Sequence, residues 1–436
     1  MARPRPLLWD VMEEHLEEAA FLWTQWEATL TSPRFSRASG ASGPEERLRA
    51  HLDALVLGGT PVEKKLLAPA LVGGEADLAF AAAAALLLGG QDAPVLEAMA
   101  SAEEPTLGAM TSAVALTAMP TAEPALLRLA MVGAPAAQAA ALVALSARGA
   151  NPGEALRRAA ASPDARVQQA AIRSARSAPV EVARPLILQA LGSPLATVRE
   201  AAFEVGLVIG MRQAWDAVRL AAAASPPSAA ALLLLALGGG GDELEPLLAA
   251  VTRPAPPPAA LFAAGFSGRR AAADACATLL ASGDARTARL AAEAFSAITG
   301  LVLEGPFVAD THPPEPEQPI PFEDEDLDGD LAEGPEALLP EPNAGQIERW
   351  WKQHRSSFDA DGRCVGGKPV SGAALYQALE HGPLRRRHAH AVEVAVRSGG
   401  KLQILGLRWL RAQAVPLEAL QKVDVGRPFR ELLRGS

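Results

Sequence analysis

An internal repeat of about thirty residues is the feature of this sequence that most constrains its fold. The clearest copies, SPDARVQQAAIRSA, SPLATVREAAFEVG and SPPSAAALLLLALG, begin at Ser162, Ser193 and Ser225, which lie 31 and 32 residues apart. Pro105 and Pro135 mark two weaker copies nearer the N-terminus. Because one unit of this length cannot bury an apolar face alone, successive units must stack to form a continuous core.

Each copy has the pattern of a helical hairpin. A serine followed by proline is typical of a helix N-terminus, because the hydroxyl accepts a hydrogen bond from a free amide and proline fixes a helical φ angle. Glycine-rich stops such as 238–241 separate this helix from a second one, for which 182–191 and 243–251 are examples. The sequence therefore predicts antiparallel helix pairs. The expected repeat starts lie near Pro105, Pro135, Pro163, Pro194 and Pro226.

The composition favours helix over sheet. Hydrophobic residues make up 49% of the chain but aromatic residues only 4%, so the apolar content is mainly Ala, Leu and Val. Ala and Leu lose little side-chain entropy in a helix, whereas strands prefer β-branched and aromatic residues. We expect an all-α protein with essentially no sheet.

Paired alanines at 170–171, 201–202 and 291–292 would let neighbouring helices approach closely. This pattern resembles HEAT-like repeats, and GDARTARLAAEAFSAITG (283–300) is the segment most similar to a helix of that family. The resemblance implies a HEAT-like α-solenoid. An ordinary globular helical domain is the alternative.

Composition divides the chain into four parts. Residues 1–58 contain a long amphipathic segment and form an N-terminal helical cap, and residues 59–300 form the repeat array. Residues 301–343 form an acidic, Pro-rich linker, and residues 344–436 form a basic helical C-terminal module. Four helices are expected in this module, at IERWWKQH, GAALYQALEHG, LRRRHAHAVEVAVRSG and LGLRWLRAQ.

The net charge of −10 is unevenly distributed. Residues 343–436 carry 16 Lys and Arg against 8 Asp and Glu, a net charge of +8, so the remaining residues carry −18. An acidic body argues against nucleic acid as the main ligand, because binding to phosphates needs a basic face. The two parts are expected to attract each other.

Cysteine content and hydropathy favour a cytoplasmic protein that does not enter the membrane. Cys276 and Cys364 are too few for a disulfide framework and have no CxxC spacing. The longest apolar runs, at 78–88 and 229–237, are too short to span a bilayer.

The segment DEDLDGDLAEGPE, residues 324–336, nearly matches a calcium-binding loop. Asp324, Asp326 and Asp328 occupy the first three ligand positions, but Pro335 stands where the loop needs a bidentate Glu. We therefore predict a solvated acidic linker without a metal. Its acids and Phe322 are candidate contacts for the C-terminal module, the array or a basic partner.

Two further motifs lack an essential residue. GRCVGGKP (362–369) has the spacing of a phosphate-binding loop, but Pro369 replaces the Ser or Thr that holds magnesium. We expect Pro369 and Ser371 to begin the next helix instead. His388 and His390 are two residues apart on a predicted helix, so they point to different faces and cannot grip one metal. We expect no cofactor and no metal site.

Arg385, Arg386 and Arg387 follow Gly382 and Pro383 at a predicted helix N-terminus, where the helix dipole disfavours positive charge. An anionic group should compensate, either the acidic linker or an acidic partner. The alternative is that these arginines pair within the array.

Trp350 and Trp351 are candidate partner contacts, although tryptophans more often pack internally. Because they are adjacent on one helix, we expect that they cannot both face the same core.

The motifs HLEEAAFLW, RLRAHLDAL, FSAITG, PFEDEDL, WW and GPLRRRHA together resemble a proteobacterial family of HEAT-repeat-like proteins with no assigned activity. The resemblance covers nearly the whole chain. Genes of that family sometimes lie near components of type VI secretion, so the resemblance implies a setting in secretion and supplies no catalytic residues.

The leading function hypothesis is a non-catalytic scaffold or adaptor for a protein partner, because solenoids present long surfaces and no HExxH, GxSxG or Cys/His cluster is present. One alternative is an immunity-type inhibitor whose acidic surface blocks a basic toxin. Another is a HEAT-like DNA-repair glycosylase, which would need a basic concave face.

Overall fold

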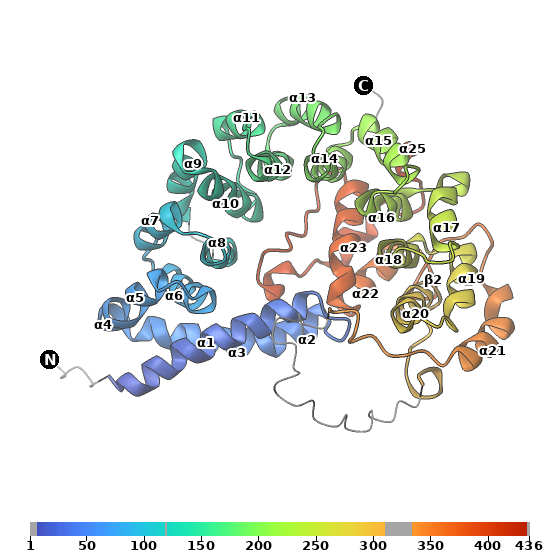
Figure 1. Ribbon diagram of the computed structural model, residues 1–436, viewed down its shortest axis with the longest axis horizontal. Helices are drawn as coiled ribbons and strands as arrows, with labels where there is room; N and C mark the ends of the chain where they lie inside the picture. The colour runs from blue at the N-terminus through green and yellow to red at the C-terminus, as the bar shows by residue number, and fades with distance from the viewer. Residues whose placement is uncertain (1–6, 118–119, 310–333, 434–436) are drawn as a thin grey trace, which may run out of the picture.

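The computed structural model describes residues 7–117, 120–309 and 334–433. These residues are almost entirely helical, and their helices form a curved array in two layers (Figure 1). The prediction of an all-α, HEAT-like solenoid of antiparallel helix pairs is confirmed. No helix in the described part of the chain is long and apolar enough to cross a membrane.

Even-numbered helices line the inner side of the arc and odd-numbered helices cover them from outside (Figure 1). The inner helices are α6 (Ala76–Leu88), α8 (Thr106–Leu116), α10 (Pro135–Ala147), α12 (Ala165–Ser174), α14 (Ala196–Val208), α16 (Ala229–Gly238), α18 (Pro258–Ser267) and α20 (Ala285–Thr299). The outer helices are α7 (Ala93–Ser101), α9 (Glu123–Val132), α11 (Glu154–Ala160), α13 (Val180–Leu191), α15 (Arg212–Ala222), α17 (Glu245–Val251) and α19 (Arg270–Leu279). Each inner helix packs against the next one. The chain returns through an outer helix between them, so successive inner helices run in the same direction (Figure 1).

The role of the Ser-Pro pairs differs from the expectation. α10 does begin at Pro135, but α12 begins two residues after Pro163. The cap of α12 is Asp164, whose carboxylate accepts the amide of Arg166 at 2.8 Å, while the hydroxyl of Ser162 accepts the amide of Asp164 at 3.2 Å. The Ser-Pro pair thus forms a turn that leads into the helix instead of capping it.

The N-terminal cap contains α1 (Trp9–Leu30), α2 (Arg37–Ser42) and α3 (Pro44–Leu57). The array then begins with α4 (Gly59–Val62), a π-helical turn at Glu63–Leu67 and α5 (Ala68–Val72). The predicted amphipathic helix is α1, which buries Leu16, Trp23 and Trp26. Trp23 stacks on Phe80 of α6 with ring centroids 4.4 Å apart, so the cap continues the core of the array.

The C-terminal part contains α21 (Ala344–His354), α22 (Gly372–Glu380), α23 (Leu384–Arg397), α24 (Leu417–Gln421) and α25 (Phe429–Leu432). It also holds a β-hairpin, β1 (Cys364–Val365) and β2 (Lys368–Pro369), with Cys364 opposite Pro369. Three of the four helices predicted there are present. The fourth prediction is wrong, because LGLRWLRAQ forms only a 3-10 turn at Leu410–Gln413.

Within the C-terminal part, α22 and α23 lie inside the arc, whereas α21 lies next to α19 at its outer side (Figure 1). α23 packs on α14 and α16 of the inner layer and on α1 of the cap. One hydrophobic cluster includes residues of the cap, the array and this segment, among them Trp351, Val392 and Phe429. The concave side of the array is therefore occupied by the chain itself.

Candidate functional site

The inner helices present their C-terminal carbonyls along one edge of the array, which we call the carbonyl edge. Because the helices are parallel, their negative dipole ends gather there, which favours cations. Arginines of the C-terminal part bind these carbonyls on three helices. Arg408 Nε donates to Ala147 O at 3.1 Å, Arg397 Nη2 to Leu237 O at 3.1 Å and Arg363 Nη2 to Phe266 O at 3.1 Å. The positive charge of this part is thus used to hold it against the array.

The β-hairpin completes the same edge. The amide of Cys364 donates to Gly268 O at 2.8 Å, that of Gly366 to Ala297 O at 2.8 Å and that of Gly367 to Ile298 O at 3.0 Å. These are amides of the segment that resembles a phosphate-binding loop, and two of them bind the end of α20. Ser371 caps α22 by accepting the amide of Ala374 at 3.1 Å, as expected, but Pro369 lies in β2 instead of at the helix start.

Glu393 in α23 is completely buried and lies between two arginines. Arg363 donates to it through both terminal nitrogens, one at 2.9 Å, and Arg397 Nε donates at 2.7 Å. Burial alone would raise the pKa of Glu393, but the two guanidinium groups outweigh burial and hold the pKa well below its ordinary value. The buried carboxylate therefore stays charged and fixes both arginines at the carbonyl edge.

Arg385 and Arg386 meet a carboxylate of the array. Arg385 Nε lies 2.9 Å from Glu293 Oε1 in α20, and Arg386 Nη1 lies 3.9 Å from the same oxygen. Arg386 is buried over the ring of Phe266, 3.9 Å from its centroid, and burial lowers its pKa to about 10. The compensating anion is thus within the array, which was the alternative to an external acidic partner.

Arg387 faces the other side of α23. Its guanidinium donates to Gln413 Oε1 at 3.2 Å, to Gln413 O at 2.8 Å and to the carbonyl of Leu379. Burial lowers the pKa of Arg387 to about 10. Its donors are used inside the protein, so this side chain holds the C-terminal part together.

Trp350 and Trp351 both pack internally, which corrects the expectation that adjacent indoles cannot share a core. Their rings lie 6.2 Å and 5.1 Å from the ring of Phe295, both edge to face. Trp351 also donates through Nε1 to Asp274 Oδ1 at 2.9 Å, and Trp350 stacks on His354. Both reach the same phenylalanine because the two indoles lie next to each other, nearly parallel and with ring centroids 6.3 Å apart.

Phe322, Asp324, Asp326 and Asp328 lie outside the described residues. The described ends of the acidic linker do contact the array, because Glu336 pairs with Arg286 at 2.6 Å and Glu341 with Arg289 at 3.5 Å, both on α20. The amide of Ala309 donates to Glu341 O at 2.9 Å, which brings the two described ends together.

The opposite edge carries the N-termini of the inner helices and the Ser-Pro turns. We call residues 160–164, 192–195 and 223–228 the Ser-Pro rim; they precede α12, α14 and α16. Two pockets open here, of about 280 and about 600 Å³; the first lies between α12, α13 and the start of α14, and the second between α14, α15 and the turn before α16.

The two pockets occupy equivalent positions in successive repeats. Eight residues that line the first have counterparts 31 positions later that line the second. Examples are Gln168 and Arg199, Ile172 and Phe203, and Gln189 and Leu220. A repeated sequence has thus built a repeated, partly apolar recess on the rim.

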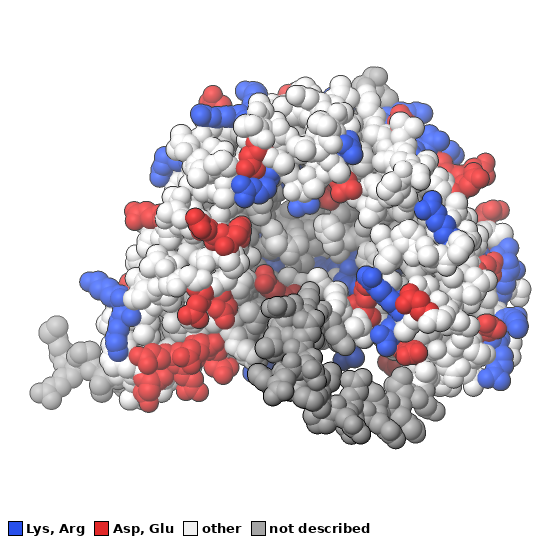
Figure 2. All heavy atoms as spheres, viewed as in Figure 1, with Lys and Arg blue, Asp and Glu red and all other residues white. Residues whose placement is uncertain are grey.

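Charge is unevenly distributed over the array. Residues 153–230, which include the Ser-Pro rim, carry nine arginines and six acidic residues, a net charge of +3. Residues 59–152 carry −4 and residues 231–300 carry −1. Figure 2 shows acidic side chains gathered over α1 at the lower left, on the cap.

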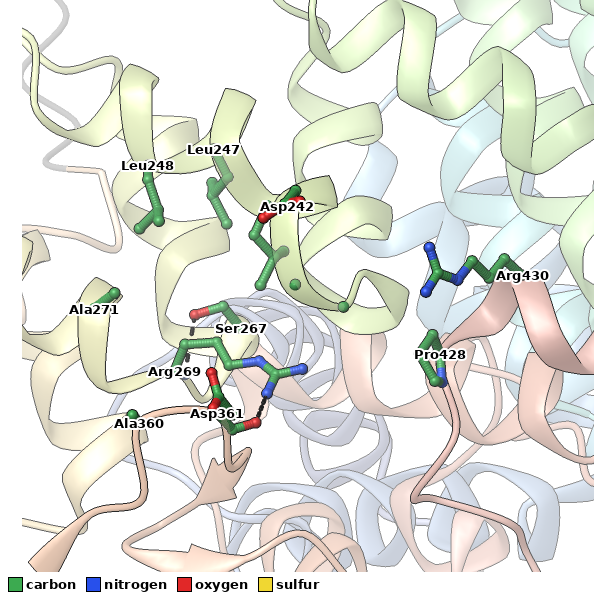
Figure 3. A pocket seen from close by; sticks show the side chains of 13 residues that line it. Asp242, Leu247, Leu248, Ser267, Arg269, Ala271, Ala360, Asp361, Pro428 and Arg430 are labelled. Carbon is green, nitrogen blue, oxygen red and sulfur yellow. Dashed lines mark hydrogen bonds between the residues drawn. The ribbon is translucent and has the colours of Figure 1, made fainter.

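A third cavity, of about 480 Å³, lies between α17, the turn before α19 and α25 (Figure 3). Arg269 and Arg430 enter it from opposite walls, together with Asp242 and Asp361. Arg269 donates to the carbonyl of Asp361, and burial lowers its pKa. Because two arginines are balanced by two aspartates, the lining has no net charge to select an ion.

Among the described residues no group of three or more His, Cys, Asp or Glu is placed to hold a metal ion. No known family model matches the sequence, and no curated protein matches it.

Several solved structures are similar in fold. YibA of E. coli is 16% identical, with 57% of this chain and 96% of that chain covered and a TM-score of 0.38. A chain from the complex of Kap95p with RanGDP is 16% identical, with coverages of 64% and 46% and a TM-score of 0.33. Human deoxyhypusine hydroxylase is 16% identical, with coverages of 67% and 99% and a TM-score of 0.24. Similarity at this level says nothing about function.

Sequence reasoning missed both edges of the array. The rim pockets could have been found by aligning the repeats at a shift of 31, which places Ile172 over Phe203 and Gln168 over Arg199. The carbonyl edge has no such signal, because its arginines are scattered over the C-terminal part.

Proposed function

We propose that this protein is a non-catalytic scaffold that binds a partner protein along the Ser-Pro rim. The observation that carries the proposal is the pair of equivalent pockets one repeat apart. A series of equivalent recesses suits a long protein ligand better than a single small molecule, which needs one enclosed site.

Occupation of the concave side supports this choice of surface. Open solenoids offer their concave face to partners, but here α22 and α23 lie inside the arc and α23 packs on α14 and α16. The rim, by contrast, exposes apolar side chains beside its pockets. Leu195 is 37% exposed and Leu220 is 76% exposed.

The resemblance to HEAT-repeat-like proteins encoded near secretion genes adds a setting to the proposal. In that setting the partner is a component of bacterial type VI secretion, and the scaffold acts as its adaptor in the cytoplasm.

Affinity purification from the native host, followed by mass spectrometry, tests the proposal. We expect a protein that wild type retains to be lost with Leu195→Glu/Leu220→Glu. Leu57→Glu is the matched control, because Leu57 is 87% exposed but lies on the cap. Retention that is equal in all three forms, or no specific retention at all, would contradict the proposal.

An immunity-type inhibitor is a second candidate, favoured by the exposed acidic face of α1. Asp10, Glu13, Glu14 and Glu17 are exposed or partly exposed there, and Phe21 on the same helix is 56% exposed. A basic toxin would suit such a face. Glu13→Lys/Glu17→Lys should then abolish retention of a basic protein and leave rim-dependent retention intact.

A further inference from the structure

We infer that the Ser-Pro rim receives an acidic segment of the partner protein, which places one apolar side chain in each of the two equivalent pockets. This inference rests on the proposed function and adds the chemical class of the partner. It depends on three properties of the rim: the direction of the helices, the charge of the surrounding side chains, and the spacing and lining of the pockets.

The direction of the inner helices makes the rim electropositive. α12, α14 and α16 all point their N-termini toward it, so their positive dipole ends gather there. Asp164 caps α12 and Ser228 caps α16. α14 lies between the two pockets, and its N-terminus has no side-chain cap and no acidic residue in its first turn. On the carbonyl edge the opposite ends of the inner helices are already bound by this chain's own arginines and amides. On the rim, Asp164 binds the N-terminus of α12 and pairs with Arg166, but no side chain of the described residues caps α14.

The side chains around the rim also carry a net positive charge. Of the nine arginines in residues 153–230, several have no ion pair within the described part of the chain. Arg157 lies one turn before Ala160 of the first pocket, and Arg173 follows Ile172 of that pocket. Arg199 and Glu200 both line the second pocket. The recesses lie in a sector of net charge +3 within an otherwise acidic array, and an acidic ligand complements that sector.

The pockets themselves accept apolar groups. Ile172, Leu186 and Val198 line the first, and Phe203, Ala217 and Leu220 line the second. Neighbouring helices lie about 8–10 Å apart, so equivalent points of adjacent repeats are separated by a similar distance. A polyproline II segment advances about 3.1 Å per residue with three residues per turn, so residues i and i+3 lie on one face about 9 Å apart. A partner segment with an apolar residue at every third position and acidic residues between them therefore matches the pocket spacing and the charge of the rim.

Three synthetic peptides separate the contributions of charge and apolar spacing. The test probe is a fluorescent 15-residue peptide of five Leu-Asp-Pro units. The second probe, five Leu-Lys-Pro units, keeps the leucines and reverses the charge, and the third, five Ser-Asp-Pro units, keeps the charge and removes the apolar groups. We expect the first to bind the full-length protein at least tenfold more tightly than either of the others, with affinity falling as salt increases.

Protein variants locate the binding. Leu220→Glu and Arg157→Glu should each weaken binding of the Leu-Asp-Pro peptide at least tenfold, whereas Leu57→Glu should leave it unchanged. These side chains are exposed or at the edge of a pocket, and thermal melting confirms that each variant is folded. Equal affinity for the acidic and basic peptides, or binding that ignores both rim variants, would overturn the inference.

The two proposals can fail separately. If a native partner is retained in a rim-dependent way but the acidic peptide does not bind the rim, the scaffold proposal stands and the acidic class is wrong. If retention of the partner does not depend on the rim, the scaffold proposal itself is wrong, whatever the peptides do.

Discussion

The carboxylate of Glu45 in α3 accepts the backbone amide of Leu410, a residue 365 positions further along the chain. The same carboxylate accepts the amide of Arg411 at 3.1 Å and the indole nitrogen of Trp26 at 3.3 Å. Glu45 is completely buried, so no water replaces these bonds. One side chain of the cap therefore holds the C-terminal part inside the arc.

Replacing this carboxylate should destabilise the whole protein. Glu45→Ala leaves buried donors without an acceptor, and each such group costs about 1–3 kcal/mol, so we expect a loss of about 2–4 kcal/mol in the free energy of unfolding. Urea denaturation measures it. Glu46→Ala is the matched control, because Glu46 is exposed and adjacent. A loss of equal size in the two variants would show that the contacts of Glu45 add nothing.

Glu393→Gln should lower the free energy of unfolding more than Glu45→Ala does. It leaves Arg363 and Arg397 buried without a counter-charge, and breaking a buried pair in this way costs about 3–5 kcal/mol. Thermal or urea unfolding of the variant checks the size of the loss. Glu348→Gln serves as control, because Glu348 in α21 is only half-buried. A loss below about 1 kcal/mol would contradict the central role given to this carboxylate.

The lowered pKa of Glu393 predicts that the stability of the protein depends on pH. The pKa of Glu393 in the folded protein is well below its ordinary value of 4.5, so its protonation opposes folding. Its stabilising contribution is present above about pH 4.5 and is lost as the pH falls toward the folded-state pKa. We expect wild type to lose stability more steeply than Glu393→Gln between about pH 4.5 and 3. Parallel stability curves for the two proteins over that range would exclude this contribution.

Gly265 in α18 leaves the space that Arg386 fills. A Cβ atom at this position would lie 2.7 Å from Arg386 Nη2 and 3.0 Å from Ala294 Cα. Gly265→Ala should therefore displace the guanidinium or separate α18 from α20, with a loss of about 1–3 kcal/mol. Gly283→Ala is the control, because no atom lies within 4 Å of its Cβ position. Melting temperatures that change equally in both variants would contradict this reading of the contact.

Calcium should not stabilise the protein. The sequence 324–336 lacks the bidentate Glu that an EF-hand loop requires. Adding millimolar calcium is expected to leave the melting temperature unchanged, because a ligand stabilises a fold only in proportion to its occupancy. A rise of several degrees that EDTA reverses would show that the loop binds the ion after all.

Local sequence was sufficient to predict the repeat array. The spacing of Ser162 and Ser193 indicated the number of residues per hairpin, and the Ala- and Leu-rich composition favoured helices. The helix starts were displaced by two or three residues in the later repeats, because Asp164 and Ser228 compete with the preceding serines as caps.

The position of the C-terminal part could not be predicted in this way. Arg386, Arg387 and Glu393 have the composition of a solvated helix face, yet all are buried. The partners of the two arginines lie on α18, α20, α22 and residues 410–413, and those of Glu393 are Arg363 and Arg397. A contact such as Glu45 with Leu410 joins residues with no local relation in sequence. The acidic residues of the linker were matched with Arg385–Arg387 on charge alone, and Glu293 was overlooked because it is a single acid in an apolar helix.

The filled centre of the arc limits how this array can change in length. In an open solenoid each repeat contacts only its neighbours, so whole repeats can be added or removed with little effect on the rest. Here α23 touches α1, α14 and α16 at once, and removing one repeat would change the curvature that this helix requires. The number of repeats is therefore tied to the dimensions of the C-terminal part, and the chain should unfold in one cooperative step instead of fraying from its ends.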